Sequence, residues 1–170
     1  MPPIPGLQLR LLGDGDSLAA LTDLLHRAYA RHLAAGLRFY ASHQPVDVTE
    51  KRARKGECWV GEIEGQLVAT ATWVPPDRCG GSPWYDRADV ASVGQFAVDP
   101  PFQRRGVGRA MMDLVERRAS ELGAAELALD TAENAAGLIA MYTARGYRFI
   151  EHVDWRPDTN YRSVVLSLKL

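Results

Sequence analysis

Apolar residues are distributed along the chain in a pattern that predicts strands alternating with helices. Short apolar runs bounded by turn residues predict strands, and apolar positions that recur every three to four residues predict amphipathic helices. The predicted strands cover residues 7–12, 59–63, 67–74, 90–98, 127–130, 147–150 and 164–170. The predicted helices cover about 17–33, 107–122 and 135–145, with a short basic helix over 49–56 that ends at a glycine.

The order of these elements predicts the topology of the sheet. The strand that ends at Val98, the helix after it and the following strand form a βαβ unit, so the two strands should lie parallel with a right-handed crossover. Short links join the other strands, which should be antiparallel, with Glu64-Gly65 as a tight hairpin turn. Asp16 is the candidate N-cap of the first helix, and Gly123 ends the second long helix. We therefore expect a mixed α/β sheet flanked by helices.

A glycine-rich turn that opens the second long helix has the most informative chemistry. Glycines at 106 and 108 leave the N–H groups of the first helical turn bare, at the positive end of the helix dipole. Arg104 and Arg105 stand beside them and can pair with phosphate oxygens. The chain has no P-loop string, and Met111 stands where the dinucleotide fingerprint needs glycine or alanine. The turn therefore predicts a different site for a phosphate-bearing cofactor.

This segment resembles the acetyl-CoA motif of the GNAT superfamily of N-acetyltransferases. That motif reads Gln/Arg-x-x-Gly-x-Gly/Ala, and the chain has Gln103-Arg-Arg-Gly106-Val-Gly108. A later segment, from Asn134 to Tyr147, is similar to a second family segment, and the order of elements fits as well. The resemblance implies one N-acetyltransferase domain over residues 7–170. It also implies the GNAT-type α/β fold: a mixed, mostly antiparallel sheet of about seven strands, with flanking helices and a central parallel strand pair.

The resemblance also implies which residues bind acetyl-CoA. In the family, the strand before the motif stays partly unpaired where two parallel strands splay, and its free backbone groups bind the pantetheine arm and the thioester carbonyl. The implied cofactor-binding residues are Phe96, Ala97, Val98, Gln103, Arg104, Arg105, Gly106, Val107, Gly108, Arg109, Ala110 and Asn134. Two of the neighbouring side chains have open alternatives. Gln95 faces either the amine or solvent, and Asn134 either contacts the pantetheine arm or serves only as a helix N-cap.

Acetyl transfer to an amine needs a neutral amine, an oxyanion donor and a proton for the leaving thiolate. Tyr142 is the candidate for the last of these, because Met141-Tyr142-Thr-Ala-Arg-Gly146-Tyr147 resembles the family's Leu-Tyr-x-x-x-Gly-Phe/Tyr. In that family the tyrosine hydroxyl commonly serves as a general acid toward the thioester sulfur. The alternative is a tyrosine that only packs in the core, since Leu138 shares its helix face.

The general base remains open at this level. Many GNAT proteins carry a glutamate on the strand that ends at Val98, but this strand has no carboxylate after Asp89. Asp89, Glu62, His152 or a chain of waters could accept the proton, and Ser92 could order a water. Each of these side chains also has a structural or solvated interpretation.

The acceptor site should be walled by the segment between the first helix and the second strand, and by the loop over residues 75–91. Tyr40, Trp84, Tyr85 and Asp89 are the candidate substrate-binding residues there, because aromatic rings and carboxylates together suit an amine-bearing small molecule. Ordinary loop packing is the alternative for each of them. The four histidines are scattered without ligand spacing, so no metal is expected.

Composition agrees with a single soluble enzyme domain. The chain has 170 residues, of which 46% are hydrophobic and 24% charged, enough to bury a full core. Its net charge of −1 creates no overall field that favours nucleic acid or membrane. The two cysteines fit a reducing cytoplasm, and the first six residues lack the regions of a signal peptide. We expect a cytoplasmic protein with neither nucleic acid nor membrane as a partner.

These observations predict an acyltransferase that moves an acetyl group from acetyl-CoA directly to a primary amine of a small molecule. Direct transfer is preferred because neither Cys58 nor Cys79 lies in a motif typical of an acyl carrier. Two alternatives stay open: transfer to a protein lysine or N-terminus, and a non-catalytic acyl-CoA-binding sensor domain. Many GNAT proteins pair through C-terminal strands, and the apolar strand 164–170 would be costly as an open edge. We therefore also expect a homodimer.

Overall fold

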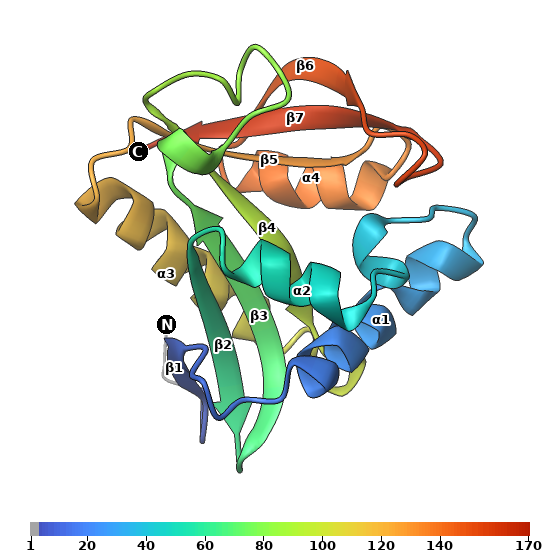
Figure 1. Ribbon diagram of the computed structural model, residues 1–170, viewed down its shortest axis with the longest axis vertical. Coiled ribbons are helices and arrows are strands. Elements are labelled where there is room, and N and C mark those ends of the chain that lie inside the picture. The colour runs from blue at the N-terminus through green and yellow to red at the C-terminus, as the bar shows by residue number, and fades with distance from the viewer. Residues whose placement is uncertain (1–3) are drawn as a thin grey trace.

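The structure, a computed structural model, describes residues 4–170, and the first three residues of the N-terminal stretch considered above lie outside the described residues (Figure 1). The strands are β1 (Gln8–Leu11), β2 (Glu57–Ile63), β3 (Gln66–Val74), β4 (Val90–Val98), β5 (Glu126–Ala132), β6 (Arg148–Asp154) and β7 (Arg162–Lys169). The helices are α1 (Leu18–Ala34), α2 (Val46–Ala53), α3 (Val107–Glu121) and α4 (Ala136–Ala144). Short 3₁₀ turns are η1 (Tyr40–Ser42), η2 (Pro76–Arg78) and η3 (Pro100–Phe102).

The strands form one sheet whose order is β1-β2-β3-β4-β5-β7-β6. β4 and β5 run parallel, whereas the other neighbouring pairs are antiparallel. The predicted mixed sheet with a central parallel pair is thus confirmed. β2 and β3 are joined by the predicted hairpin, in which Glu64 and Gly65 have φ of 50° and 79°. Positive φ at both positions is what a tight turn between twisted strands requires.

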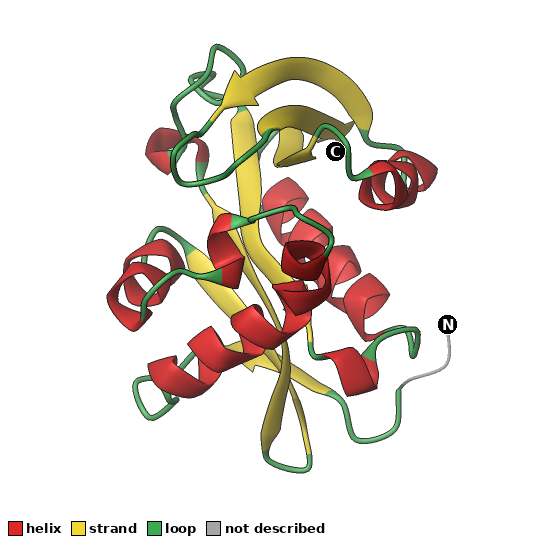
Figure 2. Cartoon of the chain, turned by 90° about the vertical axis from the view of Figure 1, so that its right-hand side faces the viewer, coloured by secondary structure: helices red, strands yellow, loops and turns green. Residues whose placement is uncertain are grey.

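Helices cover both faces of the sheet (Figures 1 and 2). The apolar stripe of α3, which includes Met111 and Val115, packs with residues of α4 and of β3 to β5 on one face. On the other face, Leu21 and Leu24 of α1 pack with α2 and β2. The central strand β3 is consequently buried along nearly its whole length, because both of its faces are covered. Within residues 4–170, no helix combines the length and the apolar character needed to cross a bilayer.

The start of α1 differs from the prediction. Ser17, not Asp16, is the N-cap: its hydroxyl accepts a hydrogen bond from the Ala20 N–H at 3.1 Å. Asp16 instead accepts two hydrogen bonds from the guanidinium of Arg10, at 2.7 and 2.8 Å. The Asp16 carboxylate, one residue before the N-cap, therefore binds β1 through Arg10 and does not cap the helix.

The short basic helix also begins earlier than predicted, because α2 spans Val46–Ala53 rather than residues 49–56. The helix also ends before Gly56, which has a different role. At this glycine a Cβ would stand only 1.9 Å from the backbone oxygen of Trp73. This glycine lets the chain pass closely beside β3 as it enters β2. It therefore belongs to the start of the strand and does not end the helix.

The last strand is not an open edge, which corrects the basis of the dimer prediction. β7 lies between β5 and β6 and pairs with both of them. The chain places β6 outside β7, so the outer strand on this side is β6, with Phe149 56% exposed. A homodimer stays a prediction, without the support of an open C-terminal strand.

Candidate active site

β4 and β5 separate part-way along their length, which opens the sheet at its centre. The two strands pair only over Val90–Ser92 and Glu126–Ala128. Further along, β4 bulges at Gln95, whose φ is 51°, where its register with β3 shifts. Figure 1 shows β5 close to the start of β4 and diverging from it toward the end of β4. A gap between parallel strands of one sheet is a common place for a ligand to bind.

Two backbone carbonyls that face this gap already have side-chain partners. The Tyr29 hydroxyl donates to the Phe96 oxygen at 2.8 Å, and Gln103 Nε2 donates to the Val98 oxygen at 2.9 Å. The backbone of Ala97, between them, faces β3 instead. Because the N–H and C=O of a strand residue point to the same side, the N–H groups of Phe96 and Val98 also face the gap. They are the backbone donors available to a ligand there.

A tight turn after β4 leads into the N-terminus of α3. Arg104 and Gly106 have left-handed φ of 59° and 84°, and no side chain caps the helix. The first bond of the helix runs from the Ala110 N–H to the Gly106 oxygen at 3.0 Å. The N–H groups of the preceding turn therefore lack a helical acceptor and form a site for an anion. Gly106 adopts this φ without strain, which is why glycine suits the position.

A groove of about 880 Å³ runs along the open strand and this turn. Most of the predicted cofactor-binding residues line it, namely Phe96, Ala97, Val98, Gln103, Arg104, Gly106, Gly108 and Arg109. Arg31 and Arg145 lie in the same lining and add positive charge, although Arg145 is already paired with Glu116 at 2.6 Å. The bare N–H groups and the arginines fit a phosphate-bearing cofactor whose long arm follows β4.

The other four predicted cofactor-binding residues are not in the lining of the groove. Val107 and Ala110 lie in the first turn of α3, with the Val107 side chain in the core, and Arg105 stacks on a neighbouring phenylalanine ring at 5.3 Å. Asn134 is exposed in the turn after β5. The N-cap of α4 is Ala135, without a side-chain hydrogen bond, so the interpretation of Asn134 as the cap is wrong. The reason is that the turn continues for one residue beyond Asn134 before the helix begins.

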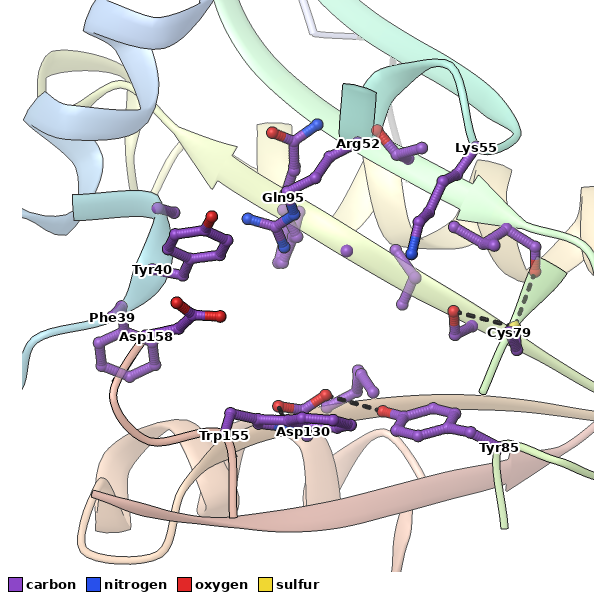
Figure 3. Close-up of a pocket in the computed structure, with 18 of the residues that line it drawn as sticks. Phe39, Tyr40, Arg52, Lys55, Cys79, Tyr85, Gln95, Asp130, Trp155 and Asp158 are labelled. Carbon is purple, nitrogen blue, oxygen red and sulfur yellow. Dashed lines mark hydrogen bonds between the residues drawn. The ribbon is translucent and has the colours of Figure 1, made fainter. Parts of the chain in front are cut away.

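A second cavity of about 370 Å³ adjoins the groove (Figure 3). Its charged lining residues are Arg52, Lys55, Arg78, Asp130 and Asp158. Tyr40 and Tyr85, both predicted to bind substrate, also line it, together with Trp155. Figure 3 shows Arg52 and Lys55 on one side of the cavity and Asp130, Trp155 and Tyr85 on the opposite side. Such a polar, aromatic enclosure suits a small charged molecule.

The groove and the cavity share part of their lining. The residues that face both spaces are Tyr29, Phe39, Phe96, Asp130 and Tyr142. They come from α1, the segment before η1, β4, β5 and α4, which are far apart in the sequence. A group bound at the end of the groove and a molecule in the cavity would meet at this junction.

Tyr142 packs in the core and also lines the ligand space, so its position is compatible with both interpretations of its sequence. Its ring is only 8% exposed and packs edge-to-face on Tyr147, with centroids 5.7 Å apart. The residue also lines the junction, so one side of it faces the ligand space. Burial raises the pKa of the Tyr142 phenol well above its usual range. The hydroxyl therefore keeps its proton at neutral pH, as a proton donor must.

Asp130 is a functional candidate that the sequence interpretation missed. Its carboxylate accepts hydrogen bonds from the Tyr85 hydroxyl at 2.9 Å and from Trp155 Nε1 at 3.0 Å. The side chain is exposed to the open cavity; the surrounding protein raises its pKa by partial desolvation, and these bonds and Arg52 oppose the rise. A carboxylate whose pKa is raised is a stronger base than an ordinary one, which suits it to accept a proton. The available signal was its place at the carboxyl end of a parallel strand.

Two of the predicted substrate-binding residues lie outside the lining of the cavity. Trp84 stacks against the Arg87 guanidinium, 4.2 Å from its ring centroid. Asp89 pairs with the same arginine at 2.8 Å and is partly exposed. Arg87 therefore links these two residues to each other on the loop before β4.

The other candidates for the base are also placed. Glu62 pairs with an arginine of β1 at 2.7 Å, and His152 lies 3.7 Å from Glu133, so both belong to the surface. Ser92 lines the cavity. Gln95 lines it as well and is only 3% exposed, so the interpretation as a solvent-facing residue is wrong. Across the described residues, no three histidine, cysteine or acidic side chains cluster in a way that could hold a metal ion.

Comparison with known families settles the class of the protein. The sequence model of the acetyltransferase (GNAT) family matches residues 18–147. This span contains the turn before α3, the open strand β4 and Tyr142. The chain belongs to the GNAT family. It is accordingly an acyltransferase, and acetyl-CoA is the acetyl donor of its family.

Curated GNAT relatives act on different amines. The S-(2-succino)cysteine N-acetyltransferase of Bacillus subtilis (strain 168) is 31% identical over 145 residues, which cover 84% of each chain. The mycothiol acetyltransferase of Kocuria rhizophila is 25% identical over 93% of this chain, which spans half of that protein. The [ribosomal protein bS18]-alanine N-acetyltransferase of Escherichia coli (strain K12) is 36% identical over 59 residues, 35% of this chain and 40% of that protein.

Solved structures share the GNAT fold. The ribosomal-protein-S18-alanine N-acetyltransferase from Escherichia coli superposes with a TM-score of 0.72 at 21% identity, over 96% of this chain and 93% of that one. A GNAT family acetyltransferase from Elizabethkingia anophelis, solved with acetyl-CoA bound, has a TM-score of 0.69 at 15% identity, over 98% and 99%. At this identity the likeness concerns the fold alone.

Proposed function

We propose that this GNAT protein transfers the acetyl group of acetyl-CoA to a primary amine of a small molecule bound in the cavity beside the groove. The observation that carries the proposal is the junction, because Asp130 and Tyr142 face both spaces. The name of the Bacillus relative, which covers 84% of this chain, specifies a cysteine derivative as its substrate. A small molecule also fits an enclosure of about 370 Å³.

The groove would hold acetyl-CoA, which supplies an activated acetyl thioester. In this proposal the N–H groups of the turn before α3, with Arg104 and Arg109, bind phosphate oxygens. The N–H groups of Phe96 and Val98 donate to carbonyl oxygens along the gap beside β4. Backbone donors held in a sheet are already oriented, so they can stabilise charge that develops on an oxygen without rearranging.

Two side chains at the junction would move protons. Asp130 accepts a proton from the amine, either directly or through a water, and its raised pKa makes it a stronger base than an ordinary carboxylate. The Tyr142 hydroxyl donates a proton to the departing sulfur, and its pKa keeps it protonated until then. Both groups line the junction, where the acetyl group and the amine would meet, so each could reach the reacting atoms.

A thiol-release assay with acetyl-CoA tests the proposal. The panel should hold small primary amines, free amino acids, S-(2-succino)cysteine, and peptides with a free N-terminus or lysine. We expect turnover with small molecules and little with peptides. Turnover confined to peptides would assign the chain to protein acetylation, and release without any added amine would reduce the activity to hydrolysis.

A further inference from the structure

The cavity contains a deeply placed cation that has no anionic partner. Arg52 extends into the cavity from the last turn of α2, with its guanidinium 5.5 Å from the ring centroid of Tyr40 (Figure 3). Within residues 4–170 it forms no ion pair, whereas its neighbour Arg54 pairs with Glu50 at 2.7 Å. Burial of the guanidinium lowers the pKa of Arg52, which reflects the cost of keeping this charge away from water. Arg52 is partly exposed to the cavity, so an anion bound there could reach it and form the ion pair that the protein itself does not supply.

A network of buried amides holds this guanidinium in place. Arg52 donates to the Gln44 Oε1 at 2.5 Å, and Gln44 is fully buried. Gln44 Nε2 in turn donates to Gln95 Oε1 at 2.6 Å and to Thr49 Oγ1 at 2.8 Å. Because the guanidinium of Arg52 can only donate hydrogen bonds, Gln44 must turn its oxygen toward Arg52. Its NH₂ group then faces the oxygen of Gln95. One guanidinium N–H is used in this way, and the fork presents others toward the cavity.

The charges of the cavity are divided between its two sides. Lys55 lies on the same side as Arg52, whereas Asp130 lies across the cavity beside Trp155, and a second acid, Asp158, lies beside Phe39 and Tyr40 (Figure 3). Neither Lys55 nor Asp130 takes part in an ion pair among the described residues. A molecule with a negative group at one end and a positive group at the other complements this arrangement.

We propose that the acceptor is an amino acid or an amino-acid conjugate, whose carboxylate binds Arg52 while its amine lies beside Asp130 at the junction. This inference rests on the proposed function and specifies its substrate class. A carboxylate matches the planar fork of an arginine and can accept two hydrogen bonds from it. Lys55 adds a second cation for a further acidic group, and Gln44 acts as a positioning residue for Arg52.

Binding to the protein saturated with CoA tests this inference without turnover. Calorimetry at about pH 6, where amines of this kind are protonated, compares L-methionine with L-methioninamide and S-carboxymethyl-L-cysteine with its diamide. Each pair keeps its size and its amine; the first pair differs in one carboxylate and the second in two. We expect the acids to bind about tenfold more tightly than their amides, or better. Equal binding within a pair, or no binding of either acid at millimolar concentration, would overturn the inference.

Variants then assign the difference to Arg52. Arg52→Gln should abolish the preference for acids while leaving amide binding within about twofold, and Arg52→Lys should restore part of it. Arg54→Gln is the matched control, because it removes an arginine of the same segment that is paired at the surface. A loss of acid and amide binding alike in Arg52→Gln would show that the arginine only supports the fold, and would also overturn the inference.

The two proposals fail in different ways. If amides and simple amines are acetylated at the same rate as amino acids, the proposed acetyl transfer is supported and the role of Arg52 is contradicted. If acids bind through Arg52 but no thiol is released with any amine, the binding site stands and the proposed function falls.

Discussion

The groove and the cavity are built by opposite means. In the groove, the backbone groups open to a ligand come from one continuous stretch, in which β4 leads through a tight turn into α3, and side chains of α1, β5 and α4 complete the lining. The cavity is made of side chains from α2, β4, β5 and the segment after β6, which are far apart in the sequence. A shared cofactor can be recognised by a fixed backbone, whereas an acceptor must be selected by side chains that vary. The difference predicts that mutations in the two regions affect different kinetic quantities.

The largest effect is expected at the cavity side of the junction, for Asp130→Asn. If Asp130 accepts the amine proton, kcat/KM at neutral pH should fall by about 10²-fold. Because burial raises the pKa of Asp130, activity should decline as pH falls through that pKa and the base becomes protonated. The variant should lose this acidic limb, while acetyl-CoA affinity stays unchanged by calorimetry. An unaltered pH–rate profile would remove Asp130 from the reaction.

Tyr142→Phe should lower kcat by about one to two orders of magnitude, because a general acid typically contributes ~10²–10⁴-fold and a thiolate can leave slowly without one. The ring and most of its packing are kept, so acetyl-CoA affinity should change little. Tyr147→Phe is the matched control, since that hydroxyl donates to Glu116 at 3.1 Å, away from the junction. A kcat within about twofold of wild type would leave Tyr142 as a packing residue.

Gly106→Glu tests the groove and should have the reverse signature. A carboxylate on the anion site should weaken acetyl-CoA binding at least about tenfold, with the fold intact by circular dichroism. Gly123→Glu controls for backbone strain, because its φ of 85° nearly equals the 84° of Gly106 and it lies just past the other end of α3. Equal affinities of the two variants for acetyl-CoA would contradict the assignment of the turn.

The smallest effect is expected far from both regions, at Asp16. Two hydrogen bonds from Arg10 lower the pKa of Asp16 to about 2. Its contribution should therefore be present above the pKa of the unfolded chain, about 3.9, and be lost as pH falls toward 2. Asp16→Asn should cost about 1 to 2 kcal/mol of unfolding free energy at neutral pH, measured by urea titration, and less near pH 3. Neither kcat nor acetyl-CoA affinity should change.

The sequence predicted what depends on neighbouring residues. The βαβ unit, the hairpin at Glu64 and Gly65 and the turn at Gly106 depend on local periodicity or on a positive φ, and the structure contains all three. The N-caps were less certain, because Ser17 and Asp16 are both good capping residues and only tertiary contact with Arg10 separates them.

What could not be predicted depends on contacts between distant segments. Asp130 and Arg52 are single charged residues without a motif, and only the tertiary fold sets the end of α2 and the end of β5 on opposite sides of one cavity. The position of β7 was mistaken for a similar reason, since an alternating apolar strand does not reveal how many neighbours it has. Its partner β6 precedes it in the chain but lies outside it in the sheet.

The gap between β4 and β5 also has a consequence for solubility. An unpaired strand is a template on which another extended chain can add, and this sheet carries such a stretch in its interior. Tyr29 and Gln103 occupy the Phe96 and Val98 oxygens, which an added strand would need in order to form a continuous ladder. The remaining N–H groups suffice for the few acceptors of a slender ligand but not for a full β-strand. We therefore expect the same two side chains, which lie along the groove, to hinder the addition of an extended chain at this gap.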